Sequence, residues 1–214
     1  MKWSLYLGKV FGTKIYVHWT FLILIGWILI LYLRMGKGLQ ESLIGVGFVL
    51  AIFVCIVLHE LGHVFTANRY GIYTKNITLL PIGGMANMEN MPEKPMQELL
   101  VSLSGLVVNV VIALVLYAYL SITDRIPTVE DLEAMQEANV IVNGSNFLFN
   151  LMVVNVVLFV FNLIPAFPMD GGRVLRALLS LKLDRGTSTK VAAAVGQVLA
   201  IFFVFFGFFP ISGW

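Results

Sequence analysis

Long apolar runs alternate with short polar segments along the chain, and this pattern predicts about six membrane segments. The hydrocarbon core of a bilayer is about 30 Å thick, which a helix of about 20 apolar residues can cross. Runs of this kind cover residues 19–33, 43–68, 96–120, 147–163, 173–183 and 191–209. The fifth run is long enough only for a short or tilted span. We therefore expect an all-α polytopic membrane protein.

Two segments depart from the helical pattern and predict a small membrane-associated β element. Residues 3–17 alternate apolar and polar positions, which is typical of short strands or an interfacial segment. Residues 72–91 contain β-branched residues, Pro81 and the pair Gly83-Gly84, which favour strand and turn. Because open backbone cannot face lipid, we expect this second segment to be a re-entrant hairpin that lines a protein cavity.

The composition places the chain in a membrane and excludes one class of partner. Hydrophobic residues make up 59% of the sequence and charged residues 12%, with a mean hydropathy of +0.90. Soluble globular domains do not reach these values, so the lipid bilayer is an expected partner. The net charge of +2 comes with no basic stripe, which argues against nucleic acid.

The basic residues of the short loops predict the orientation. They precede the first apolar run and follow the second, whereas the loop after the third run is acidic: Lys2, Lys9, Lys14, Arg69, Lys75 and Lys94. Because basic loops stay in the cytoplasm, we expect a protein of the cell membrane with a cytoplasmic N-terminus.

A metal-binding pattern lies inside the second apolar run, at His59-Glu60-Leu61-Gly62-His63. Histidines four residues apart share one face of a helix, so both imidazoles can reach a single Zn²⁺. The adjacent Glu60 stands where a general base for hydrolysis is needed. Ionisable residues are expensive in a membrane span, which favours a functional role.

A second motif, residues 162–172, follows more than a hundred residues later and ends in Asp170-Gly171-Gly172. Pro165 and Pro168 force the chain to unwind just before this carboxylate. A carboxylate would offset the charge of a dication held by two neutral imidazoles and leave a fourth position open, as catalytic zinc requires.

Together the two motifs resemble those of the site-2 proteases, which are intramembrane zinc metalloproteases. The resemblance implies that His59, His63 and Asp170 ligate one Zn²⁺ per chain and that Glu60 activates water. It also implies that Asn162 and Asn109 line the site, although this chain has Gly105-Leu106 where the family usually has Gly-Pro. The expected activity is endopeptidase cleavage within transmembrane segments of other, single-span, membrane proteins.

The segment around Gly83-Gly84 allows two interpretations. Residues 77–88 offer a strand edge that can pair with an unwound substrate and replace its lost helical hydrogen bonds. Alternatively, Gly83 and Gly84 only make a tight turn. Two other function classes also remain: a membrane metal transporter, and a catalytically inactive scaffold that retains zinc.

Several polar residues have plainer interpretations than catalysis. His18 is expected to be an interfacial or capping residue at the start of the first helix. Cys55 is expected to be a buried apolar side chain, although it lies one turn before His59. Asn109 and Asn155 are as well suited to helix packing as to catalysis. The arginines at positions 173 and 176 are expected to be interfacial anchors.

We expect one intramembrane domain, residues 1–214, with a catalytic core at about 43–183. Site-2 proteases often carry a PDZ domain or a C-terminal nucleotide-sensing domain. The loop at 121–146 is too short for the first, and too few residues follow the last apolar run for the second. The sequence is therefore expected to be a minimal member or a truncated one.

Overall fold

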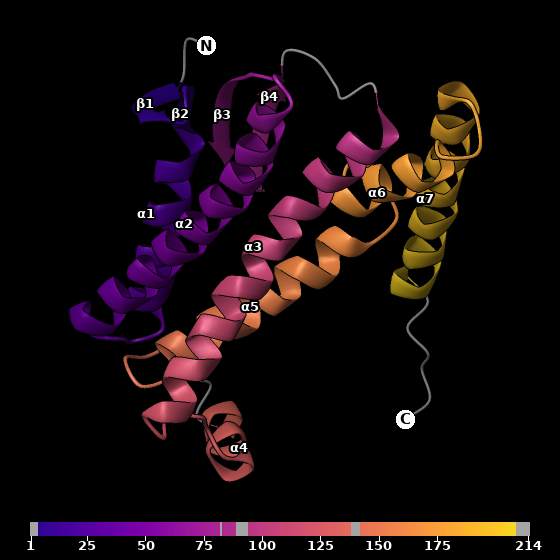
Figure 1. The fold of residues 1–214 in the computed structure, drawn as a ribbon. Coiled ribbons are helices and arrows are strands. Elements are labelled where there is room, and N and C mark those ends of the chain that lie inside the picture. Colours follow the sequence, from indigo (N-terminus) through magenta and orange to yellow (C-terminus); the bar gives the residue numbers. More distant parts are fainter. Residues whose placement is uncertain (1–3, 82, 89–93, 138–141, 209–214) are drawn as a thin grey trace.

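A computed structural model describes residues 4–81, 83–88, 94–137 and 142–208, and its described part is mostly helical with one small sheet (Figure 1). The strands are β1 (Ser4–Val10), β2 (Thr13–His18), β3 (Thr74–Leu80) and β4 (Gly83–Met88). The helices are α1 (Thr20–Arg34), α2 (Leu39–Arg69), α3 (Pro95–Ile122), α4 (Val129–Glu137), α5 (Phe147–Leu163), α6 (Asp170–Leu179) and α7 (Arg185–Phe208). The expected helical class with a small β element is confirmed.

The sheet has the order β1-β2-β3-β4, so both expected β segments join in one structure. β1 and β2 are antiparallel, as are β3 and β4, whereas β2 and β3 run parallel and are connected through α1 and α2. The inner strands pack on these helices through a buried apolar cluster: Ile15, Val17, Phe21, Phe53, Val64, Ile77 and Leu79. This packing fixes β3 and β4 against the C-terminal half of α2.

α3 is the central helix, and it contacts α2, α5 and α6. In Figure 1 the sheet, the start of α3 and α6 gather at one end of the molecule, whereas α4 lies at the opposite end. α7 lies beside α6, which it contacts. The end that carries the sheet therefore brings together segments from both halves of the sequence.

Among the described residues, three helices are long and apolar enough to cross a membrane: α2, α3 and α7 through residue 205. α1 and α5 are apolar but shorter, with 15 and 17 residues. The expected fifth segment corresponds to α6, whose 10 residues rise only about 15 Å, half the thickness of a hydrocarbon core. The count of six spans is therefore not confirmed.

The chain unwinds between α5 and α6, as the two prolines predict, and α6 then begins at Asp170. Two glycines let α6 lie against this connecting segment. A Cβ on Gly171 would lie 2.2 Å from the Leu163 carbonyl oxygen, and one on Gly172 would lie 2.8 Å from the Ala166 carbonyl carbon. No larger residue fits at either position, so the glycines help to fix where Asp170 stands.

α2 and α3 approach closely at Gly62. A Cβ there would lie 2.9 Å from the Ser104 carbonyl oxygen and 2.8 Å from a methyl group of Val108. Because one of these contacts is with backbone, the helices would have to separate to admit a side chain. The glycine of the motif thus sets the spacing between α2 and α3.

We expect Gly62→Ala to destabilise the protein by about 1–3 kcal/mol, the usual range for an overpacked interior. The measurement is unfolding in mixed micelles followed by far-UV circular dichroism. The matched control is Gly47→Ala in the same helix, where a Cβ meets nothing within 4 Å. Equal stability of the two variants would contradict the close approach of α2 and α3.

Candidate metal centre

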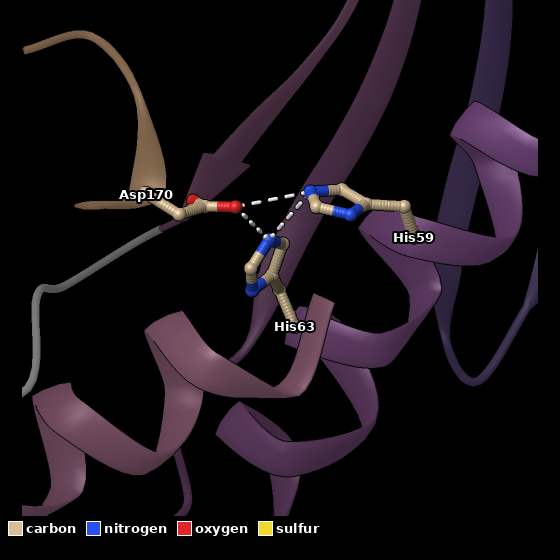
Figure 2. A group of neighbouring side chains, drawn as sticks. All are labelled: His59, His63 and Asp170. Carbon is tan, nitrogen blue, oxygen red and sulfur yellow. Dashed lines mark hydrogen bonds and ion pairs between the residues drawn. The ribbon is translucent and has the colours of Figure 1, made fainter. Parts of the chain in front are cut away.

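Two imidazoles and one carboxylate converge where α2 meets the start of α6 (Figure 2). Oδ2 of Asp170 lies 3.0 Å from Nε2 of His59 and 3.0 Å from Nε2 of His63, and the two nitrogens are 3.1 Å apart. All three residues are buried, with Asp170 only 8% exposed. This is the group of candidate metal ligands found in the described part of the chain.

The three donor atoms form a triangle that suits a small cation. A tetrahedral zinc ion with bonds of about 2.0–2.1 Å separates its ligand atoms by about 3.3 Å, close to the distances observed here. Two nitrogens and one carboxylate oxygen are also a known donor set for catalytic zinc, and three protein ligands leave one position open. The residues therefore fit Zn²⁺.

The orientation of His63 is fixed by α3. Nδ1 of His63 lies 2.7 Å from the carbonyl oxygen of Val101, which can only accept a hydrogen bond. Nδ1 therefore carries the proton, and Nε2 keeps a lone pair for a metal. The same carbonyl accepts a hydrogen bond of 2.6 Å from the hydroxyl of Ser104.

Gly105 of α3 supplies the surface on which both imidazoles rest. A Cβ at this position would lie 2.3 Å from Nε2 of His63 and 2.8 Å from Cε1 of His59. A side chain there would occupy the space that the rings and a metal need. Gly105 is thus part of the site, a role that the sequence analysis did not assign to it.

Asp170 is the first residue of α6, where unpaired N–H groups and the helix dipole favour a negative charge. The carboxylate is thereby stabilised by its own helix as well as by its partners. The chain thus delivers an anion to a buried place without requiring a basic side chain beside it.

Glu60 is half-buried and faces β4. A Cβ on Gly84 would lie 2.8 Å from Cγ and 3.0 Å from Oε1 of Glu60. The hairpin expected beside the site is therefore present, and Gly84 leaves room for this carboxylate. Gly83 begins β4 opposite Leu80.

The resemblance implies that Asn162 and Asn109 line the site, but among the described residues neither forms a hydrogen bond with His59, His63 or Asp170. Asn162 is half-buried, and its Nδ2 donates to the Leu158 carbonyl oxygen at 3.0 Å. Asn109 is 0% exposed, and neither of its polar side-chain atoms has a partner among the described residues. Their role in binding substrate stays a prediction.

The plainer interpretations of Cys55 and Asn155 agree with the structure, whereas α1 has no side-chain cap hydrogen bond at its N-cap residue, Trp19. Nδ1 of His18 lies 2.8 Å from the hydroxyl of Thr20 at the start of α1. Cys55 is buried outside the donor group, and its sulfur accepts a hydrogen bond of 3.4 Å from Asn155. Asn155 thus links α5 to α2, as a packing residue does.

The prediction for Arg176 was wrong. Its guanidinium is buried and forms an ion pair with Glu98 of α3 instead of anchoring α6 at an interface. Sequence reasoning missed this pair because the two residues are 78 positions apart. The available signal was Glu98 itself, a charged residue at the start of a strongly apolar helix.

Comparison with known families agrees with this arrangement. The family model described as peptidase family M50 matches residues 47–206, which include all three donor residues and Glu60. The chain belongs to peptidase family M50. The resemblance to site-2 proteases that the two motifs indicate is thereby confirmed.

Two comparisons with proteins of Methanocaldococcus jannaschii show similarity over nearly the whole chain. A zinc metalloprotease is 40% identical over 209 residues, which are 97% of this chain and 55% of the relative. A solved structure of a site-2 protease has a TM-score of 0.66 and 36% identity, with 98% of this chain and 87% of that chain covered. The chain spans about half the length of the curated relatives it matches.

We expect Gly105→Ala in this M50 member to lower its affinity for Zn²⁺ by about 10–100-fold, the usual effect of disturbing the support of a ligand. The reason is the overlap between the new methyl group and both rings. The measurement is competition for Zn²⁺ with a chromophoric chelator. Gly47→Ala is again the control, and an unchanged affinity in both variants would contradict the role given to Gly105.

Proposed function

We propose that this chain is a zinc-dependent endopeptidase that cleaves transmembrane segments of other membrane proteins. The observation that carries the proposal is the buried triangle of His59, His63 and Asp170 next to Glu60, in a chain whose described part has three helices long and apolar enough to cross a membrane. Membership of family M50 and the similarity to zinc metalloproteases support it. One Zn²⁺ per chain would be held by the three donor residues.

Zinc at such a site supplies a Lewis acid that polarises a peptide carbonyl and makes water nucleophilic near neutral pH. Glu60 takes the proton of the attacking water and passes it to the leaving amine. Its half-buried carboxylate is suited to this exchange because Gly84 leaves it room beside β4.

Two amides are proposed to hold the substrate carbonyl as negative charge develops on its oxygen. Asn162 would exchange its present hydrogen bond to Leu158 for one to the substrate. The side chain of Asn109 has no hydrogen-bond partner among the described residues, so it would lose none by binding substrate. It is fully buried, however, and can act only when substrate entry opens this face of α3.

The substrate is proposed to be a single-span membrane protein that unwinds and pairs with β4. Within the described residues β4 is one of the two edge strands of the sheet, and Gly84 lies against Glu60. An added strand at this edge would lie next to the general base and would satisfy backbone groups that lose their helical partners. Gly83 and Gly84 then serve binding as well as the turn.

The proposal also includes the placement of the protein in the bilayer. We propose that residues 1–214 form one domain of the cell membrane with a catalytic core at about 43–183 and a cytoplasmic N-terminus. Six membrane segments remain part of this proposal, with α1 and α5 crossing a locally thin bilayer and α6 entering it only partly.

The other two function classes lack comparable support. A metal transporter needs several exchangeable sites along a path, whereas one candidate metal group is present among the described residues. An inactive scaffold with structural zinc needs four protein ligands, and this group has three.

Glu60→Gln separates the three classes. We expect it to retain the fold and one Zn²⁺ per chain while lowering cleavage of a single-span membrane substrate by at least about 10²-fold, because a general base contributes about 10²–10⁴-fold. The measurements are metal content of the purified protein and cleavage of a co-reconstituted substrate. A metal transporter would instead carry zinc across the membrane of reconstituted vesicles, both as wild type and as Glu60→Gln.

Glu41→Gln is the matched control, since it changes the same side chain in the first turn of the same helix. Glu41 is exposed and pairs with Lys37 at 3.7 Å, far from the site in sequence, so cleavage should not change. Normal cleavage by Glu60→Gln would refute the catalytic assignment.

Proline substitutions in β4 test the strand pairing. Met85 and Ala86 are consecutive residues opposite Thr78 and Ile77, and their N–H groups point to opposite edges of the strand. Proline at the position whose N–H faces β3 should lower the stability of the protein, because it removes a hydrogen bond of the sheet. Proline at the position whose N–H faces outward should leave stability intact and slow cleavage about tenfold, because it removes one hydrogen bond to the substrate strand. Unchanged cleavage by the outward variant would exclude strand addition.

A further inference from the structure

A buried ion pair joins α3 to α6 outside the donor group. Glu98 is 5% exposed and Arg176 is 8% exposed. Nε of Arg176 donates to Oε1 of Glu98 at 2.8 Å, and Nη2 donates to the same oxygen. The guanidinium also lies over the ring of Phe167, 5.4 Å from its centroid.

Both residues of the pair belong to helices that position candidate metal donors: α6 carries Asp170, and α3 contacts His63. Arg176 lies on the short helix α6, whose first residue is Asp170. Glu98 lies in the first turn of α3, one turn before Val101, whose carbonyl holds His63. The first two turns of α3 thus contact both His63 itself, through Val101, and the helix that carries Asp170, through Glu98. These two donor residues come from distant parts of the sequence.

The pair sets the position of α6 in a way that apolar packing does not. The closest neighbours of a Cβ on glycine 171 or 172 belong to the segment that precedes α6 and not to α3, so these glycines do not by themselves fix where α6 lies along α3. A buried charge pair loses its compensation when its partners slide apart, so it favours a single register. The planar guanidinium, with Phe167 beneath it, adds directionality.

We propose that Glu98 and Arg176 are positioning residues that hold Asp170 in register with His59 and His63. The proposal rests on the proposed role of those three residues as zinc ligands. A shift of α6 along α3 would carry the Asp170 carboxylate away from both imidazoles, because α6 is a short rigid helix of 10 residues. Metal affinity is therefore the property that the pair controls.

The test is Zn²⁺ binding by the full chain in lipid nanodiscs, measured by competition with a chromophoric chelator. We expect Glu98→Gln and Arg176→Gln each to weaken binding by about 10–100-fold, the range for groups that orient a ligand from outside the coordination sphere. The reversed pair, Glu98→Arg with Arg176→Glu, should recover part of the loss. Arg173→Gln is the control, since it removes the same charge from a half-buried position of the same helix.

A second background separates positioning from general stability. In an Asp170→Ala chain, zinc is held by the two histidines, and Glu98→Gln should then change its affinity by less than about threefold because α6 no longer supplies a donor. A variant that only loosens the fold would weaken binding equally with and without Asp170. Far-UV circular dichroism checks that each variant is folded. If a single substitution prevents folding, the Zn²⁺ affinity of the reversed pair is measured instead.

The outcomes separate failure of the metal site from failure of the positioning role of Glu98 and Arg176. A wild-type chain that binds no Zn²⁺ refutes the metal site itself. Tight wild-type binding that neither Glu98→Gln nor Arg176→Gln weakens refutes the positioning role alone, as does an effect of Glu98→Gln that is undiminished in the Asp170→Ala chain.

Discussion

The convergence of three donor atoms at one buried point is the constraint on which the rest of this structure depends. His59 and His63 come from one helix, but Asp170 comes from a second element more than a hundred residues later. α3 lies between them and contacts both α2 and α6. Its glycine at position 105 and the carbonyl of Val101 hold the rings, so the central helix organises a site to which it contributes no metal donor.

An apolar environment makes a buried polar group costly when it has no partner, and three buried groups in and around the site each have a specific compensation. The Asp170 carboxylate stands at a helix N-terminus, the proton of His63 faces a carbonyl, and Glu98 faces Arg176. An isolated charge would be costly in such surroundings. The polar residues of this chain are few, and their pairing ties the helices together more specifically than the surrounding apolar contacts do.

The parts of the fold that could be predicted from sequence are those with a local signal. The spacing of His59 and His63, the prolines before Asp170 and the glycines of the β hairpin each describe a few neighbouring residues, and the structure agrees with them. The placement of Arg176 was wrong, and the contact of Gly105 with both imidazoles was missed, because each depends on which helices meet. The sequence also counted α6 among the membrane segments, although this helix ends after 10 residues.

The separation of the donors along the chain has a consequence for biosynthesis. Ribosomes make the chain from its N-terminus, so α2 and its histidines enter the bilayer long before Asp170, which lies 107 residues beyond His63, has been translated. A nascent chain therefore offers only two neutral donors and cannot balance a captured dication. The three candidate donors therefore come together only once the second half of the protein has been made and has folded against the first.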